Sequence, residues 1–261
     1  MLRAFAYSSL LRELILRRIR SRYIGSIFGG AWSILNPLLQ LILYTVVFSV
    51  ILELRFGEDQ STFRFAEFLF CALLPWMAVH EGVVQSTHSL IENANIIKKL
   101  RFPLEIIPLS TVLAAVFHQL AGALVFAIVI LVSGSLNWSF LPLILPILTV
   151  QILLTYGIAL LTSTLQVYFR DMAQIVTLAF MALFWITPIV YPKERAAQAG
   201  LDWILNANPL THLVEAYRLA FLGQPPVSFA GIAYLCFCAL LALVLGRLLL
   251  RRTRKELVDL L

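Results

Sequence analysis

The stretch IIPLSTVLAAVFHQLAGALVFAIVILV, residues 106–132, contains no aspartate, glutamate, lysine or arginine. About 20 mainly apolar residues in a helix are enough to cross the hydrocarbon core of a bilayer. Backbone groups in lipid must be satisfied within their own segment, which favours a helix here. Five other stretches are also long and mainly apolar. The sequence therefore predicts six transmembrane helices, at about 34–54, 66–88, 106–132, 141–165, 173–191 and 229–250.

The composition of the whole chain agrees with this reading. Hydrophobic residues make up 61% of the 261 residues and charged residues 13%, against roughly 45–50% and about 25% in soluble domains. The expected fold is an all-α membrane protein with three parts: a cytoplasmic N-terminus (1–32), a six-span domain (33–250) and a cytoplasmic tail (251–261). The three cysteines lie in predicted spans and are expected to be small packing residues.

The basic residues are distributed unevenly along the chain. If both termini face the cytoplasm, 15 of the 20 lysines and arginines lie in cytoplasmic segments, as the positive-inside rule requires. An even number of spans gives the same orientation. The arginines gather at the ends of spans and not in one patch, which disfavours a nucleic-acid partner.

The first basic segment, residues 8–24, has apolar side chains at every fourth position: Leu11, Ile15, Ile19 and Tyr23. This spacing predicts an amphipathic helix lying along the inner headgroup layer; the alternative is an ordinary basic anchor. Arg18 and Arg22 fall near the apolar edge, so their side chains are expected to snorkel to the headgroups.

Two connecting segments on the cytoplasmic side could contact another protein. Residues 89–108 are amphipathic, with exposed donors expected at Asn93, Asn95, Lys98 and Lys99, and isoleucines such as Ile96 that a solvated connector would not need. A short helix that docks on another protein fits better. The second segment contains Arg170-Asp171, which forms either a charge pair at the membrane edge or a partner contact; the sequence leaves both open.

The connection at 192–228 is too apolar for a free external loop, and Pro209 divides it into pieces too short to span. A re-entrant helical hairpin in the outer leaflet is expected. Aromatic residues gather near this side, including Phe180, Phe184, Trp185 and Tyr191. They form either an ordinary interfacial belt or a surface on which sugar rings stack.

The chain lacks the motifs of ATP hydrolysis. No glycine is followed by lysine, so no GxxxxGK[ST] phosphate loop exists. If ATP drives transport here, another chain binds the nucleotide and its magnesium, and no cofactor is expected on this one. Within the predicted spans, His80, Glu81 and His118 are ionisable and therefore functional candidates. They form either a proton relay or, as we favour, the lining of a wet region near the inner surface.

Four segments resemble one family. RSRYIGSIFGGAWSILNPLLQLILYTVVFS (20–49), LLPWMAVHEGVVQSTHSLIENANIIKKLRFPLEIIPLS (73–110), LQVYFRDMAQIV (165–176) and FWITPIVYP with ILNANPLTHLVEAYR (184–218) are similar, in this order, to the membrane subunits of type-2 ABC exporters. Within that superfamily the sequence is most similar to exporters of O-antigen, capsule or teichoic-acid polysaccharides.

The resemblance implies a homodimer in the bacterial inner membrane, paired with two copies of a separate ATPase. The cargo would be a glycan on a polyprenyl diphosphate lipid, passing through a central channel. Residues 8–24 would be the interface helix, 90–102 the helix that couples to the ATPase, and 194–222 the re-entrant pair. Arg170-Asp171 would form a second ATPase contact, and the aromatic residues near 180–191 would line the channel.

A basic inner rim would attract the diphosphate headgroup. Arg20, Arg22, Lys98 and Lys99 are the residues expected there. Three other functions stay open: a type-2 ABC exporter of a small hydrophobic compound, a membrane-embedded glycosyl- or acyltransferase, and a non-catalytic scaffold. The enzyme would need paired acidic residues at one membrane depth, but Asp171 and Asp202 fall on opposite predicted faces.

Overall fold

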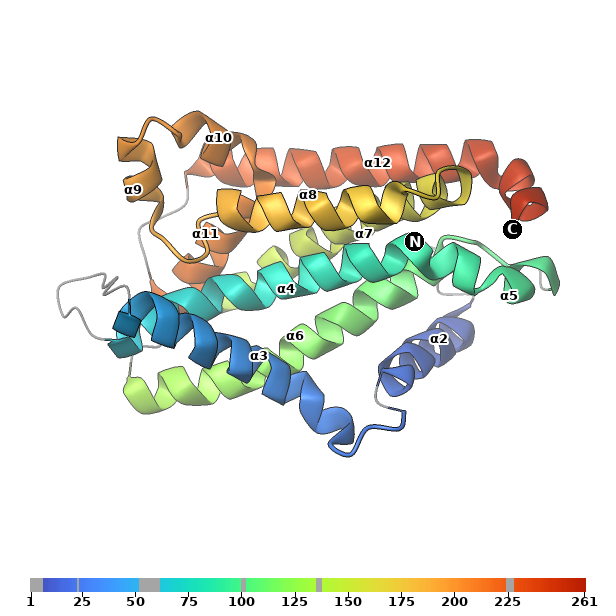
Figure 1. Ribbon diagram of the computed structural model, residues 1–261. Helices are drawn as coiled ribbons and strands as arrows, with labels where there is room; N and C mark the ends of the chain where they lie inside the picture. Colours follow the sequence, from blue (N-terminus) through green and yellow to red (C-terminus); the bar gives the residue numbers. More distant parts are fainter. Residues whose placement is uncertain (1–6, 23, 52–61, 100–101, 135–137, 224–227) are drawn as a thin grey trace.

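The computed structural model describes residues 7–22, 24–51, 62–99, 102–134, 138–223 and 228–261. Within these ranges every regular element is a helix and no strand is present, so the predicted all-α class is confirmed (Figure 1). The elements are α2 (Ser8–Ser21), η1 (Gly29–Ala31), α3 (Trp32–Tyr44), η2 (Thr45–Ile51), α4 (Thr62–Glu92), α5 (Ala94–Lys99), α6 (Ile106–Ser133), η3 (Leu141–Leu143), α7 (Ile144–Tyr168), α8 (Met172–Ile186), α9 (Lys193–Gln198), α10 (Asp202–Ala207), α11 (Pro209–Leu222) and α12 (Phe229–Leu260).

Five helical segments are long and apolar enough to cross a membrane: Gly29–Ile51, Arg64–Glu92, Ile106–Ile128, Leu141–Tyr168 and Phe229–Leu260. They coincide with five of the six predicted spans. The sixth, predicted at 173–191, is not confirmed as a span, because α8 has only 15 residues. At 1.5 Å per residue it is about 22 Å long, short of the roughly 30 Å hydrocarbon core.

The early end of α8 follows from its next residues. Thr187 has extended backbone angles (φ −77°, ψ 132°), as expected for a residue that precedes a proline. The Tyr191 hydroxyl then donates to the carbonyls of Trp185 and Ile186, at 2.8 and 3.0 Å. The turn therefore supplies partners for the carbonyls at the end of the helix.

Helix α4 runs further than the span predicted at 66–88. It continues to Glu92, because its polar residues near the inner end are buried and bonded inside the bundle: Ser86, Thr87 and Ser89 each donate to a backbone carbonyl. The predicted coupling helix at 90–102 is thus too long. Residues 90–92 belong to α4, a separate helix covers Ala94–Lys99, and residues 100 and 101 lie outside the described part of the chain. Helix α12 likewise continues through the segment predicted as the tail, to Leu260.

Helix α4 forms the centre of the bundle, with α6, α7, α8 and α11 packed around it (Figure 1). In an 18-residue apolar stretch of Arg64–Glu92, 78% of the residues are buried within the chain. In the corresponding stretch of Gly29–Ile51, only 11% are buried. The first span therefore lies at the edge of the bundle and contacts the rest of the chain along only one side.

Helices α7 and α12 pack closely where two glycines face the neighbouring helix. A Cβ atom added to Gly157 would lie 2.4 Å from the backbone nitrogen of Leu243, and one added to Gly246 would lie 2.7 Å from the Gly157 carbonyl oxygen. Small residues at such crossings let helix backbones approach within a membrane. These two glycines set the spacing of the pair.

Residues 194–222, predicted as two re-entrant pieces, instead fall in three helices, α9, α10 and α11. Helix α11 begins at Pro209, where the Asn208 side chain accepts a hydrogen bond from the Leu210 amide, and ends at Gly223 with φ of 63°. Most of α11 is buried against α4 and α12. Its Arg218 is 4% exposed, donates to the Ile189 carbonyl at 2.9 Å and lies 3.5 Å from the centre of the Phe68 ring.

Candidate functional site

A groove of about 410 Å³ runs between α3, α4 and α8. On the α3 side it is lined by Asn36, Gln40 and Tyr44, which recur every four positions and so share one face of an otherwise apolar helix. Helix α4 contributes polar side chains opposite, among them His80 and Gln85. Leu73, Met77 and Val84 also line it, so the groove combines polar side chains with a larger apolar surface.

Aromatic rings line the outer part of the groove. The rings of Tyr44 and Phe184 stack with centroids 5.8 Å apart, and the Trp76 ring meets Phe184 edge-on at 5.5 Å. Trp76 also stacks on His80, with centroids 5.0 Å apart. Offset and edge-to-face pairs of this kind hold aromatic rings in fixed orientations. The result is a continuous aromatic wall built from three helices.

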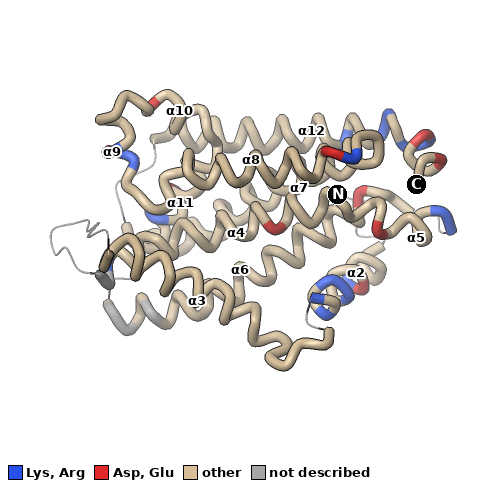
Figure 2. Tube along the Cα trace, viewed as in Figure 1, with Lys and Arg blue, Asp and Glu red and all other residues tan. Residues whose placement is uncertain are grey.

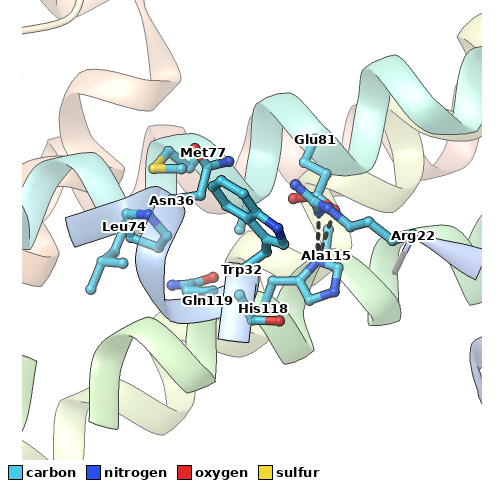
Figure 3. A pocket seen from close by; sticks show the side chains of 12 residues that line it. Arg22, Trp32, Asn36, Leu74, Met77, Glu81, Ala115, His118 and Gln119 are labelled. Atoms are coloured by element: carbon cyan, nitrogen blue, oxygen red, sulfur yellow. Dashed lines mark hydrogen bonds and ion pairs between the residues drawn. The ribbon is translucent and has the colours of Figure 1, made fainter. Parts of the chain in front are cut away.

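Three ionisable side chains meet at the inner end of the groove. Arg22 donates a hydrogen bond to Glu81, and the Nδ1 atom of His118 lies 2.8 Å from the same Glu81 oxygen and 2.9 Å from the Arg22 guanidinium. Figure 3 shows this cluster beside Trp32 and Asn36. The pocket drawn there holds about 30 Å³, enough for a water molecule.

A family model described as ABC-2 type transporter matches residues 9–222, from α2 to the end of α11. The chain belongs to this family. The assignment confirms the family that the sequence resembles.

Individual relatives are similar over nearly their full length. The O-antigen export system permease protein RfbA of Klebsiella pneumoniae is 32% identical over 232 residues, which cover 87% of this chain and 85% of that protein. RfbA of Myxococcus xanthus is 26% identical over 238 residues, 88% of each chain. The polysialic acid transport protein KpsM of Escherichia coli is 26% identical over 255 residues, covering 94% of this chain and 93% of KpsM.

The aromatic residues predicted to line a channel in this ABC-2 chain have four different settings. Phe184 lines the groove. Phe180 is 5% exposed and packs behind it, edge-on to Trp76, while Trp185 is 57% exposed on the surface of α8. Tyr191 closes the end of α8. The groove also uses Tyr44 and Trp76, which the sequence analysis missed; the stripe of polar residues on α3 was the signal that could have found Tyr44.

The predicted headgroup residues of the ABC-2 chain do not form one cluster. Arg22 lines the groove, whereas Arg20 is exposed on α2, and Lys98 and Lys99 are exposed on the separate helix α5. The structure thus brings Arg22 together with two ionisable residues of the spans, Glu81 and His118, and not with the other predicted cations.

The expectation that Arg18 and Arg22 snorkel is wrong. Arg18 forms an ion pair with Glu92 at 2.7 Å and donates to the Thr111 hydroxyl at 3.2 Å. Arg22 likewise forms an ion pair with a glutamate of α4, Glu81. Each arginine turns toward the bundle because α4 and α6 offer it acceptors. These two ion pairs attach α2 and the residue that follows it to α4.

The residues predicted to contact an ATPase lie at one end of this ABC-2 chain. Figure 2 shows most charged residues at the end formed by α2, α5, the turn between α7 and α8 and the end of α12. Asn95, Lys98 and Lys99 are exposed there, as are Arg170 and Asp171 in the turn. Asn93 instead donates to the Ser89 carbonyl at 2.8 Å, and Ile96 packs against a buried apolar cluster.

A second polar cluster crosses the middle of the bundle of this ABC-2 chain. Tyr217 donates to the Gln151 side-chain oxygen at 2.6 Å, and Gln151 in turn donates to Gln119 at 2.7 Å. All three are buried. The cluster connects α6, α7 and α11, so α11 is bonded directly to two spans.

Glu215, which lies on α11 outside the spans, has a pKa shifted by its neighbours. Burial alone would raise the pKa of Glu215 on α11, but hydrogen bonding to His212 and the charge of Lys193 outweigh it and lower the pKa. The Lys193 ammonium lies 3.4 Å from the Glu215 carboxylate. In the ABC-2 chain this ion pair attaches the short helix α9 to α11.

Proposed function

We propose that the chain is the channel-forming membrane subunit of an ATP-driven exporter. The proposed cargo is an O-antigen-like polysaccharide on a polyprenyl diphosphate lipid, moved from the cytoplasmic side across the bacterial inner membrane. The groove between α3, α4 and α8 is the observation on which this proposal rests. Three relatives with 26–32% identity carry names that refer to O-antigen export or polysialic acid transport, which supports a polysaccharide as cargo.

The chemistry of the groove suits a glycan. A polymer with many hydroxyl groups needs hydrogen-bond partners along its path through hydrocarbon, and Asn36, Gln40 and Gln85 supply donors and acceptors. Aromatic faces such as those of Tyr44 and Phe184 pack on the apolar faces of sugar rings. A small hydrophobic cargo would have no use for the amides, so the groove favours the polysaccharide.

The proposed active form is a homodimer of this chain together with two separate ATPase subunits, and those subunits hydrolyse the ATP. The groove is open on one side, and next to it α3 and α8 expose large apolar side chains: Leu39, Ile42, Leu43, Leu178, Met181 and Trp185. A second copy facing this side would close the groove into a channel. The charged end (Figure 2) would then face the ATPases, with both termini in the cytoplasm.

The groove is tested by replacing its aromatic rings. We expect the double variant Tyr44→Ala/Phe184→Ala to lose most of the stimulation of ATP hydrolysis by a lipid-linked glycan, about tenfold or more, because each stacked ring contributes roughly 0.5–1.5 kcal/mol beyond its buried area. The measurement is ATP hydrolysis by the subunit and its ATPase in lipid nanodiscs, with and without the glycolipid.

The matched control is Phe237→Ala, which removes an exposed ring from α12, away from the groove. This control should keep normal stimulation. If both variants respond to the glycolipid as the unaltered protein does, the groove is not the path of the glycan.

The ATPase contact is tested by reversing charge on α5. Lys98→Glu/Lys99→Glu is expected to abolish the glycolipid-stimulated part of ATP hydrolysis while the subunit still inserts and folds, since both side chains are exposed. Arg195→Glu, on α9 at the opposite end of the bundle, is the control. Co-purification of the ATPase with each variant gives a second readout. Unchanged co-purification and stimulation for the α5 variant would remove α5 from the proposed interface.

A further inference from the structure

The cluster at the inner end of the groove joins segments far apart in the chain. Arg22 follows α2, Glu81 belongs to α4 and His118 to α6. Their side chains differ in access: that of Arg22 is 34% exposed, that of Glu81 15% and that of His118 10%. Arg22 is therefore the member of the cluster that a molecule in the groove reaches first.

The contacts of this cluster compete with one another. The Nδ1 atom of His118 is within hydrogen-bond distance of both the Arg22 guanidinium and the Glu81 carboxylate. With a proton, Nδ1 donates to Glu81 but cannot accept from Arg22; without one, it accepts from Arg22 but cannot bond to Glu81. No protonation state satisfies both contacts at once. If Arg22 finds another anionic partner, a protonated Nδ1 of His118 can donate to Glu81 with no competing contact to Arg22.

The space around Arg22 can receive such a partner. Arg22 lines both the groove of about 410 Å³ and the small pocket beside Trp32. A guanidinium binds phosphate oxygens through two parallel hydrogen bonds, with a strength and geometry similar to those of its pairs with carboxylates. When Arg22 turns to a phosphate, Glu81 keeps His118 as its hydrogen-bond partner, so its carboxylate is not left buried without a donor.

We propose that Arg22 is the anchor of a binding site for a phosphate or diphosphate group, and that Glu81 occupies this site until the anion displaces it. The inference rests on the proposed function, because the diphosphate of a lipid-linked glycan is one source of the anion. The phosphate of an anionic membrane lipid is the other. Since Arg22 joins the end of α2 to α4 through Glu81, displacement also releases one of the two ion pairs that attach α2 and the residue that follows it to α4.

The proposal is tested by binding of farnesyl diphosphate, a short prenyl diphosphate without a glycan. The purified full-length subunit is placed in phosphatidylcholine nanodiscs, and equilibrium binding of the radiolabelled compound is measured. Glu81→Gln is expected to bind it about tenfold more tightly, because the substitution removes the charged group that competes with the anion for Arg22. Arg22→Gln is expected to lose the binding, and Arg22→Gln combined with Glu81→Gln should show none of the gain.

Arg18→Gln is the matched control, since it removes the neighbouring ion pair to Glu92 and leaves the cluster intact. Its affinity should equal that of the unaltered protein. The thermal unfolding midpoint of every variant is measured in the same nanodiscs, so that affinity is compared between folded proteins. If folded Glu81→Gln binds no more tightly, or folded Arg22→Gln binds equally well, the proposal is wrong.

A second arm identifies the source of the anion. Phosphatidylglycerol is added to the nanodiscs: if it displaces farnesyl diphosphate from Glu81→Gln, the site accepts membrane lipids, and if it does not, the site selects the diphosphate. Either result upholds an anion site at Arg22. The proposed function is judged separately by the response of Tyr44→Ala/Phe184→Ala to a glycolipid. If the response to the glycolipid does not depend on these rings but the binding gain is seen, only the proposed function is contradicted. If the binding gain is absent but the response depends on the rings, only the anion site is contradicted.

Discussion

Gly157→Ala is expected to lower the thermal unfolding midpoint of the subunit by about 3–10 °C, since overpacking a helix contact costs roughly 1–3 kcal/mol. The added methyl carbon would lie 2.4 Å from the Leu243 nitrogen and 2.5 Å from the Ala242 carbonyl carbon. Both atoms belong to the backbone of α12, so no side-chain rotation relieves the clash and the two helices must separate. Separation would also disturb the buried residues along α7, which contacts α4 on its other side.

The sign of this effect distinguishes packing from helix propensity. Alanine is favoured over glycine in a helix by about 1 kcal/mol, so the substitution would stabilise α7 if the crossing were loose. Gly30→Ala, where an added Cβ meets nothing within 4 Å, is the control and should leave the midpoint nearly unchanged. Unfolding is followed by size-exclusion profiles of heated, detergent-solubilised protein. An unchanged or raised midpoint for Gly157→Ala would mean that α7 and α12 do not cross at this glycine.

Arg218→Met should destabilise the outer end of the molecule by about 2 kcal/mol or more, the typical cost of leaving a buried acceptor without its charged donor. Methionine keeps much of the length of the side chain but removes the hydrogen bond to the Ile189 carbonyl and the contact with the Phe68 ring. These contacts tie α11 to α4 and to the segment after α8. Arg218→Lys should be intermediate, because an ammonium lacks the planar fork of the guanidinium.

Amide hydrogen exchange locates this effect. In Arg218→Met, exchange is expected to rise in α11 and in residues 187–192, while α2 and the inner half of α4 keep their protection. Gln198→Met, at an exposed position on α9, serves as the control and should exchange as the unaltered protein does. Equal protection of α11 in both variants would show that Arg218 does not hold the outer helices in place.

Arg18 on α2 and Arg22 just after it show how far the sequence could predict the site. Their spacing indicated an imperfect amphipathic face, and the general behaviour of arginine at a membrane surface predicted snorkelling. The acceptors that bind them, Glu81 and Glu92, are 59 and 74 residues away in the chain. Helical periodicity describes one helix at a time and contains no information on which face of another helix lies opposite.

The end of α8 is a different case. Thr187-Pro188 is a local signal, and the preference of a residue before proline for extended backbone could have ended the predicted span there. The apolar residues that follow, through Tyr191, extended the prediction too far. Hydropathy alone does not separate an apolar helix from an apolar turn whose polar groups are bonded locally, as the Tyr191 hydroxyl bonds here.

The sequence by itself determined the all-α class, the positions of five apolar helices and the family, because apolar length, proline and glycine positions and motif order are properties of contiguous residues. Only the tertiary structure decided which polar side chains share a groove and which ions pair. Those contacts depend on how each helix is rotated and where it crosses its neighbours. Gly157 and Gly246, for example, let α7 and α12 pack closely together. Arg22, Glu81 and His118 thus form one site only after three helices have packed.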